Sequence, residues 1–347
     1  RTICARLMND RFALCLPREE FDEKRVADSV KELQREFSGN SFHLHTYMGV
    51  YEIRDRDEAV SIMVDKANIA ADTIKNNYDC CVAYYDEHLL EISIEQRRLL
   101  GEFEPALQND EFVMYLQPQV NRDGAAKGAE ALVRWAHPSR GILTPYAFID
   151  ILENAGLIYK LDLYIWEKAA QKLAEWKEKG YGSYHISVNI STKDFYIIDI
   201  YETFTGLINK YGIAASNLHL EITETTLMTD FEKNMNIIHK LQGVGFRVEI
   251  DDFGSGYSSL NMLKDISADV LKIDMGFLRK SENEVKGQDI LESIITLAGK
   301  IGMDVITEGV ETKKQLDMLT MMGCHEFQGY YFSKPVPVSE FEEKYLV

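Results

Sequence analysis

The sequence predicts an α/β fold: a (β/α)8 TIM-like barrel with an antiparallel first strand pair, preceded by a smaller α+β unit. Eight short apolar segments alternate with mostly helical segments over about 240 residues. The connection between the first two, residues 121–126, is too short for a crossover helix. Polar residues recur where these segments end, and barrel enzymes place their chemistry at such ends.

Composition and charge limit the classes of protein and partner. The chain has 347 residues, 46% hydrophobic and 27% charged, which suits a globular protein with a barrel and a smaller domain. Its formal net charge of −18 argues against DNA or an anionic membrane surface as a partner. Five cysteines without a Cys-x-x-Cys pair indicate reduced thiols and a cytoplasmic location for this portion. We see no signal peptide or membrane segment, and an upstream sensor or anchor is left open.

Residues 1–90 form the first predicted unit. Apolar runs at 4–7 and 12–16 flank a polar tetrapeptide and predict a hairpin. A helix from Phe21 to Phe37, a strand over 42–53 and a helix over 57–76 follow from the apolar spacing. Residues 91–109 are predicted to form a connecting helix that leads into the main domain, residues 110–347.

This first unit resembles the C-terminal half of a GGDEF (diguanylate cyclase) domain. The resemblance rests on residues 5–7, 12–17, 65–67 and 74–75. At the family's signature the sequence reads Met8-Asn9-Asp10-Arg11-Phe12, with Arg11 at the acidic metal and catalytic position. Because a cation there would repel a metal ion, the resemblance implies a partial, degenerate and inactive module. An unrelated α/β cap is the alternative.

The main domain carries the regular pattern of the barrel. The candidate strands are 112–120, 127–135, 184–190, 217–223, 246–251, 269–274, 303–308 and 325–330. The helices predicted between them include 160–179, 193–211, 229–243 and 282–301. Thr144-Pro145 is a predicted N-cap and first helical residue, and Gly180 is a predicted helix stop.

The stretch from Phe246 to Leu260 is the centre of the predicted site. It reads as a strand that delivers Asp251 and Asp252, followed by a loop with two glycines and the start of a helix. Since side chains alternate along a strand, we expect the strand to end between the two aspartates so that both can face one site. Taken alone, a solvated acidic turn is an equal alternative.

Polar residues stand at matching positions of the other predicted strands. The set comprises Gln117, Glu130, Asn189, Glu221, Asp251, Asp252, Lys272, Glu308, Glu311 and Gln328. A single acid at a strand end is more often a helix cap, but so many carboxylates together cannot be buried without a compensating cation. Oxygen ligands without cysteine or histidine favour Mg²⁺ or Mn²⁺ over zinc. Adjacent aspartates suit a two-metal centre for displacement at phosphorus.

Three residues are candidates for further roles in such a reaction. Lys272 is a candidate for holding the attacking water or offsetting charge, and Glu308 for accepting a proton. Arg134, four residues after Glu130, is placed to grip a phosphate. Other features have simpler interpretations: His137 shapes a turn, and Trp166 and Trp176 are packing residues.

In this order the motifs resemble the EAL domain, the cyclic di-GMP phosphodiesterase family, over residues 100–345. The name-giving motif stands as Glu130-Ala131-Leu132-Val133-Arg134-Trp135. The other matches are Gln117-Pro118-Gln119, Asn189-Ile190-Ser191, Glu221-Ile222-Thr223-Glu224, residues 251–259, Lys272-Ile273-Asp274, Glu308-Gly309-Val310-Glu311-Thr312 and Gln328-Gly329-Tyr330.

The resemblance implies a role for each matching residue. Glu130, Asn189, Glu221 and Asp251 would hold the first metal ion, and Asp252 belongs with the second. Lys272 would position the water, and Glu308 would be the general base or a partner of the second metal. Arg134 would contact a substrate phosphate, Leu132 would lie beneath the site, and Gln117 and Gln328 would lie near the substrate. Glu311 would anchor the loop at 253–259.

The sequence therefore predicts hydrolysis of cyclic di-GMP to linear pGpG with two Mg²⁺ or Mn²⁺ ions. The main alternative is a catalytically silent cyclic di-GMP receptor that signals through protein partners, against which the complete ligand set argues. A barrel enzyme acting on another phosphodiester or an enolisable acid is a more distant alternative. The resemblance also implies a homodimer formed through the barrel near residues 253–259.

Overall fold

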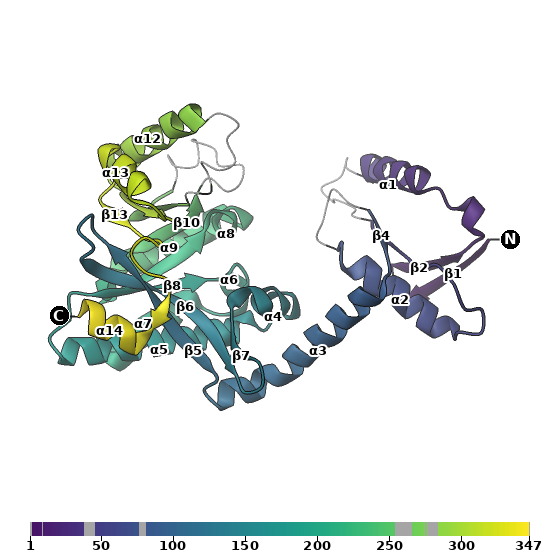
Figure 1. The fold of residues 1–347 in the computed structure, drawn as a ribbon, viewed down its shortest axis with the longest axis horizontal. Coiled ribbons are helices and arrows are strands. Elements are labelled where there is room, and N and C mark those ends of the chain that lie inside the picture. The colour runs from purple at the N-terminus through teal and green to yellow at the C-terminus, as the bar shows by residue number, and fades with distance from the viewer. Residues whose placement is uncertain are drawn as a thin grey trace. The chain divides into compact units, whose positions relative to one another are not determined.

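The computed structural model describes residues 2–8, 10–37, 46–75, 81–253, 266–274, 276 and 284–346. It contains two compact units, residues 1–101 and 102–347, here the N-terminal unit and the barrel unit (Figure 1). The division falls inside helix α3 (Glu87–Gln108), and the connecting helix was expected over residues 91–109. Among the described residues, no helix is both long enough and apolar enough to cross a membrane.

The N-terminal unit contains the predicted hairpin, in which β1 (Ile3–Met8) and β2 (Arg11–Cys15) pair antiparallel. A 3-10 turn η1 (Arg18–Glu20) and helix α1 (Glu23–Phe37) follow. Strands β3 (Met48–Val50) and β4 (Val82–Tyr84) pair in parallel, and α2 (Val60–Asp72) packs against both. A Cβ at Gly49 would lie 1.8 Å from the Ala67 carbonyl oxygen, so only glycine allows this packing. Residues 42–45 of the predicted strand lie outside the described residues.

The barrel unit is closed by eight strands, as predicted. They are β5 (Phe112–Val120), β6 (Ala126–His137), β8 (His185–Ile190), β9 (Leu218–Thr223), β10 (Val248–Phe253), β11 (Val270–Asp274), β12 (Asp304–Glu308) and β13 (Glu326–Phe327). Neighbours from β6 to β13 run parallel, whereas β5 pairs antiparallel with both β6 and β13. The antiparallel first pair is therefore confirmed. Short strands β7 (Gly141–Leu143) and β14 (Val336–Pro337) extend the sheet.

Helices cover the outside of the barrel strands (Figure 1). They are α4 (Ile149–Ala155), α5 (Ile158–Glu178), α6 (Asp194–Ile197), α7 (Ile200–Tyr211), α8 (Glu224–Thr229), α9 (Phe231–Val244), α12 (Glu284–Lys300), α13 (Lys313–Met321) and α14 (Val338–Tyr345), with 3-10 turns η2 (Pro145–Ala147) and η3 (Ala215–Asn217).

Two details of the predicted helices are wrong. The single helix predicted over 193–211 is broken, because Ile198 is extended and the Asp199 side chain caps α7 by accepting from the Glu202 amide. Thr144-Pro145 opens only the short turn η2, and the Thr144 side chain makes no capping hydrogen bond. The predicted stop at Gly180 is present, with a positive φ of 91° just after α5.

Large aromatic residues fill the space between strands and helices. Trp166 on α5 is buried and donates from Nε1 to the carbonyl oxygen of Asn189 at 2.9 Å, which fixes the end of β8. Trp176 is also buried and stacks on Phe341. His137 bonds Glu102 Oε2 at 2.9 Å and accepts from the Ser139 amide, so the interpretations as packing and turn residues hold.

Candidate active site at the C-terminal ends of the strands

Lys272 is the centre of the polar cluster inside the barrel. Its side chain is fully buried, and its Nζ forms ion pairs with carboxylates from four different strands. The partners are Glu308 Oε1 at 2.8 Å, Glu221 Oε1 at 3.0 Å, Glu130 Oε2 at 3.4 Å and Asp251 Oδ1 at 3.5 Å. Strands β6, β9, β10 and β12 each contribute one of these acids, so the fold brings together four residues that lie far apart in the sequence.

The electrostatics of this cluster are dominated by excess negative charge in a buried place. Burial opposes the charged form of Lys272, but the surrounding carboxylates outweigh it and raise the Lys272 pKa. Burial raises the pKa of Glu221 well above its usual value, and the charge of Glu130 adds to this. The pKa of Glu308 is raised for the same main reason, although Lys272 opposes the shift. One lysine is not enough positive charge for these acids.

The prediction that the strand ends between Asp251 and Asp252 is wrong. Strand β10 continues to Phe253 through a bulge: Ile250 pairs with Leu271 and Phe253 pairs with Ile273, so two residues of β10 oppose Lys272 alone. Asp252 takes a positive φ of 57° there, and its amide donates to Asp251 Oδ1 at 2.8 Å. Because Lys272 points into the barrel, the bulge places both aspartates on the side of the cluster.

Asp252 lies further out than Asp251, at the exposed rim of the barrel. Partial desolvation, and then the negative charges of Asp251 and Asp274, raise the pKa of Asp252. The two aspartates are therefore electrostatically coupled, as expected for side chains that face one site.

An amide network adjoins the cluster on the other side. Asn189 Nδ2 donates to Glu130 Oε1 at 3.2 Å, and Gln328 Nε2 donates to Glu130 Oε2 at 2.5 Å and to Gln117 Oε1 at 3.3 Å. Gln117 in turn donates to the Ser333 carbonyl oxygen at 3.3 Å. Opposite Glu130 across the β5–β6 pair stands Gln117 itself. The structure thus brings Gln117, Asn189 and Gln328 to the first carboxylate of the site.

The donor set fits a hard divalent cation. Both carboxylate oxygens of Glu221 are buried and accept no hydrogen bond within the described part of the chain. A buried anion without hydrogen bonds is costly unless a cation is supplied. The surrounding oxygens of Glu130 and Asp251 are the ligands that Mg²⁺ and Mn²⁺ prefer, and rotation of the Asn189 amide presents its oxygen to the same place.

On β6, Leu132 lies two residues after Glu130 and Arg134 lies four residues after it, so all three side chains point to the same face of the strand. Both Leu132 and Arg134 are partly buried. The Arg134 guanidinium lies over the Tyr115 ring at 5.5 Å, and its Nη1 donates to the Val133 carbonyl oxygen at 2.8 Å. Desolvation lowers the Arg134 pKa, although the group remains a cation. This positioned cation lies on the same inward-facing row as Glu130.

Comparison with known proteins assigns the family. The EAL domain matches residues 101–335 of the chain. The chain belongs to the EAL-domain family. Members of this family that act as phosphodiesterases generally depend on divalent metal ions, which agrees with the oxygen-rich donor set.

Curated relatives carry activities in their names. The "Bifunctional diguanylate cyclase/cyclic di-GMP phosphodiesterase MucR" of Pseudomonas aeruginosa is 31% identical over 346 residues, covering 97% of this chain and 50% of that protein. The "Cyclic di-GMP phosphodiesterase PdeR" of Escherichia coli K12 is 33% identical over 240 residues, covering 69% of this chain and 36% of that protein. The chain therefore spans half of one relative's length and about a third of the other's.

A solved structure gives the same fold. The structure described as "PaMucR Phosphodiesterase, c-di-GMP complex" has 33% sequence identity and a TM-score of 0.67, covering 70% of this chain and 99% of that chain. The described strands therefore form the TIM-like barrel of EAL structures.

One expectation for the EAL domain concerns the loop after β10. Glu311 follows β12 and is exposed, with its amide donating to Gln315 Oε1 at 2.9 Å. Residues 254–259 of the loop that Glu311 was expected to anchor lie outside the described residues. Anchoring of this loop by Glu311 stays a prediction.

Sequence reasoning missed a buried acid pair behind β8. Asp162 on α5 accepts from Ser191 Oγ at 2.7 Å, and Asp194 on α6 accepts from the Ser191 amide at 2.9 Å. Burial raises the pKa of Asp194 to about 6, and burial together with the charge of Asp194 raises the pKa of Asp162 well above its usual value. The pair fixes the chain just after Asn189. In the sequence the pair is visible only as two aspartates, one in the predicted helix before the Asn189-Ile190-Ser191 motif and one in the predicted helix after it.

Proposed function

We propose that this EAL domain hydrolyses cyclic di-GMP to linear pGpG with divalent metal ions bound in the cluster around Lys272. The observation that carries the proposal is the buried Glu221 carboxylate, which has an ion pair with Lys272 but no hydrogen bond. The curated relatives named as cyclic di-GMP phosphodiesterases support the substrate.

The metal ligands follow from the geometry and from the family motifs. Glu130, Asn189, Glu221 and Asp251 would hold one Mg²⁺ or Mn²⁺ ion, and Asp252 would hold a second with Glu308 nearby. Five carboxylates and one lysine leave an excess of four negative charges when all are ionised, which two divalent ions would neutralise. The ions would supply a Lewis acid that lowers the pKa of water and stabilises charge on the phosphate.

Lys272 and Glu308 then have distinct roles. The raised pKa of Lys272 keeps its ammonium protonated at physiological pH, so it donates hydrogen bonds and cannot accept the proton of the water. Glu308, 2.8 Å from Lys272 Nζ, is the general base, because bound metal ions would offset the burial that raises its pKa and would keep its carboxylate ionised. Lys272 holds the water that Glu308 deprotonates. The water oxygen forms a bond to phosphorus as the bond from phosphorus to the 3′-oxygen breaks, and the leaving 3′-oxygen takes up a proton from solvent.

The substrate is held by the residues of β5, β6 and the segment after β13. Arg134 grips a phosphate, because its guanidinium is already oriented by Tyr115 and the Val133 carbonyl. Leu132 forms the floor beneath the guanine nucleotide, and Gln117 and Gln328 hold it through their amides. Glu311 anchors the loop 253–259, near which two barrels meet as a homodimer.

Residues 1–90 of the N-terminal unit are a degenerate, inactive GGDEF-like module, joined by residues 91–109 to the EAL domain at 110–347. The alignment with the bifunctional relative MucR over 97% of the chain supports this proposal. Arg11 lies exposed at the start of β2, where a metal-binding carboxylate would be required for cyclase activity. We place this portion of the protein in the cytoplasm, where cyclic di-GMP is the partner and DNA is not.

The test is chromatography of nucleotides after the purified chain has been incubated with cyclic di-GMP and Mn²⁺. We expect conversion to pGpG, and loss of at least 100-fold in rate for Asp251→Asn, which preserves size but removes a ligand charge. Wild-type protein that binds cyclic di-GMP without converting it would instead establish the silent receptor. An equal rate in Asp251→Asn would overturn the assignment of the site.

A further inference from the structure

A second polar cluster lies at the opposite end of the barrel. It consists of His185 at the start of β8, His219 on β9 and Glu249 on β10, whose ligand atoms all lie within 4.8 Å of one another. The first residues of β6, β11, β12 and β13 line the same cavity, so it lies at the N-terminal ends of the strands. The Lys272 cluster uses the C-terminal ends. The two are separate places in the barrel.

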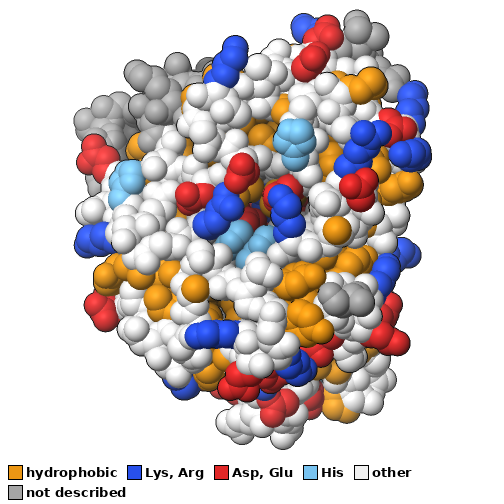
Figure 2. Space-filling view, turned by 90° about the vertical axis from the view of Figure 1, so that its left-hand side faces the viewer, with side chains coloured by type: hydrophobic (Ala, Val, Ile, Leu, Met, Phe, Trp, Pro, Cys, Tyr) orange, Lys and Arg blue, Asp and Glu red, His pale blue; other side chains and the backbone are white. Residues whose placement is uncertain are grey.

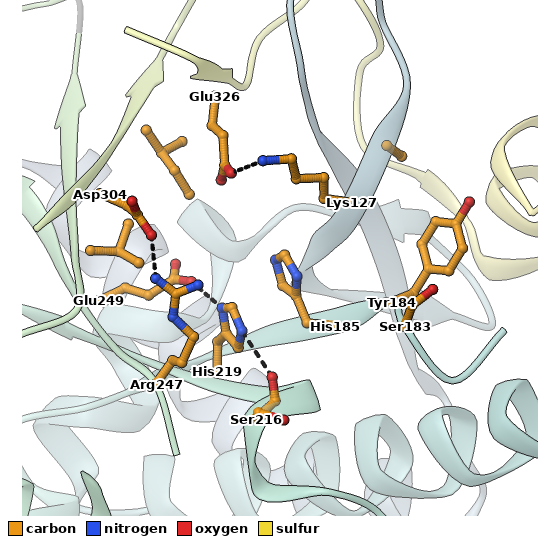
Figure 3. Close-up of a pocket in the computed structure, with 13 residues that line it drawn as sticks. Lys127, Ser183, Tyr184, His185, Ser216, His219, Arg247, Glu249, Asp304 and Glu326 are labelled. Atoms are coloured by element: carbon orange, nitrogen blue, oxygen red, sulfur yellow. Dashed lines mark hydrogen bonds and ion pairs between the residues drawn. The ribbon is translucent and has the colours of Figure 1, made fainter. Parts of the chain in front are cut away.

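The cluster is open to solvent through a cavity of about 580 Å³. Figure 2 shows histidine side chains in a hollow of the surface, between lysine or arginine and aspartate or glutamate side chains. In Figure 3 the hollow is lined by Lys127 paired with Glu326, and by Arg247 paired with Asp304 at 2.5 Å. With Glu249 added and both histidines neutral, the lining carries one net negative charge. A cation can therefore reach the cluster through the cavity, and the net negative charge of the lining attracts it.

The hydrogen bonds of His219 leave one ring nitrogen directed at Glu249. Its Nε2 lies 3.2 Å from the Ser216 carbonyl oxygen, which can only accept, so Nε2 carries the hydrogen. In a neutral ring Nδ1 then has a lone pair, and it faces Glu249 Oε1 at 2.6 Å. A proton or a cation must lie between two such acceptors. A backbone carbonyl on the other ring nitrogen is how metal-binding histidines are commonly oriented.

His185 is oriented in the same manner. Its Nε2 lies 2.7 Å from Gln119 Oε1, to which it donates, and its ring stacks on that of His219 at 3.8 Å between centroids. A Cβ at Gly128 would lie 2.4 Å from the His185 ring, so a glycine is what makes room for the imidazole. Nδ1 of His185 is left with a lone pair.

Glu249 supplies the third group, and one of its carboxylate oxygens is able to bind a cation. It is fully buried, and Oε1 accepts from Ser187 at 3.2 Å as well as facing His219. Its Oε2 has no hydrogen-bond partner in the described part of the chain. A buried carboxylate oxygen without a partner is costly, and a bound cation would remove that cost.

We propose that His185, His219 and Glu249 form a binding site for a transition-metal ion of the zinc type, separate from the catalytic cluster. Two imidazoles and one carboxylate are an established zinc ligand set, and imidazole favours such ions over Mg²⁺. Around one zinc ion, ligand atoms about 2.0–2.1 Å from the metal lie about 3.3 Å apart, so His219 and Glu249 separate slightly and the histidine rings tilt out of their stack. The ion ties β8, β9 and β10 together at their N-terminal ends.

The test uses zinc itself in the presence of millimolar Mg²⁺, which occupies oxygen sites. The chelator-treated chain is loaded with Zn²⁺, passed through a desalting column and analysed for zinc per chain by mass spectrometry. We expect one zinc ion per chain in the wild type and in Glu130→Gln, which alters only the catalytic cluster. We expect its loss in His219→Gln and in Glu249→Gln. His239→Gln, an exposed histidine on α9, is the matched control and keeps the ion.

Two further measurements keep the proposal testable if a ligand variant is poorly folded. Gly128→Ala retains all three ligands and the net charge but pushes the His185 ring away, so zinc affinity should fall at least tenfold. Co²⁺ in place of zinc should give visible absorption bands in the wild type that are absent in His185→Gln. Equal zinc content in the wild type and His219→Gln, whether both chains retain one ion or neither retains any, would show that His219 and Glu249 share only a proton.

Discussion

Lys272 Nζ and Glu308 Oε1 lie 2.8 Å apart, and the lysine side chain is fully buried. The same ammonium also faces Glu221, Glu130 and Asp251 within 3.5 Å. A cation so surrounded cannot lose its proton at neutral pH, and the acids around it cannot all remain charged without further positive charge. The pair therefore contributes to the stability of the barrel, and it lies in the cluster that we propose as the metal site.

Replacing Lys272 by methionine should destabilise the metal-free protein by about 3–5 kcal/mol, because a buried set of acids loses its counter-charge. Urea unfolding in the presence of a chelator at pH 8 measures the effect. Lys313→Met removes an exposed lysine paired with Asp317 and should change stability by no more than about 0.5 kcal/mol. An equal effect of the two substitutions would refute the central role of Lys272.

Glu221→Gln should have opposite effects with and without metal. Without metal the variant loses a buried carboxylate that accepts no hydrogen bond and whose charged form is disfavoured by burial and by Glu130, so its stability should equal that of the wild type or exceed it by about 1 kcal/mol. With Mn²⁺ it should lose the thermal stabilisation seen in the wild type and bind the ion at least about tenfold more weakly. Melting temperatures with chelator and with MnCl₂ measure both. Glu232→Gln, on the exposed face of α9, should behave as wild type in both buffers.

The Asp162–Asp194 pair should make stability depend on pH. The Asp194 pKa of about 6 in the folded protein lies above its usual value of 3.8, so folding favours the protonated form. Its contribution is full below pH 3.8 and is lost as the pH rises through about 6. Asp194→Asn removes this contribution, so its urea midpoint should fall less between pH 5 and pH 8 than that of the wild type.

The control for that comparison is Asp123→Asn, in an exposed turn between β5 and β6. Its midpoint should follow the wild type at every pH. If Asp194→Asn also follows the wild type, the buried pair does not share a proton in this range.

Arg134→Lys should weaken substrate binding more than turnover. The guanidinium is oriented by Tyr115 and Val133, and lysine retains the charge but cannot make two parallel bonds to a phosphate. We expect KM for cyclic di-GMP to rise about 10–100-fold, as for a lost bond of about 1.5–3 kcal/mol to a charged group, with kcat changing less. Arg122→Lys, exposed in the β5–β6 connection, should leave both constants unchanged. A fall in kcat alone would place Arg134 in the chemical step instead.

The sequence was sufficient for the barrel and for the members of the Lys272 cluster. Parallel strands bring their C-terminal ends to one mouth, so a row of polar residues such as Glu130, Glu221 and Glu308 at those ends had to converge. The short connection 121–126 likewise left no choice but an antiparallel pair. Both inferences follow from chain length and strand direction, which are properties of the backbone.

What could not be predicted depends on contacts between distant segments. The Asp162–Asp194 pair forms because α5 and α6 both pack behind β8, and neither acid belongs to a strand end. The cluster of His185, His219 and Glu249 lies at the N-terminal ends of the strands, whereas the motifs in the sequence mark the C-terminal ends. The bulge at Asp252 also leaves no periodic mark, because one added residue between two strand segments looks like a strand end.

The bulge at Asp252 means that the strand pairing of the barrel does not depend on this residue, although the proposed site does. Since two residues of β10 oppose one of β11, loss of the single codon for Asp252 would restore an uninterrupted ladder between Ile250 and Phe253 on one strand and Leu271 and Ile273 on the other. The barrel would close as before with one aspartate fewer. A deletion of one residue could thus remove a carboxylate from the proposed metal site while leaving the strand pairing of the barrel intact.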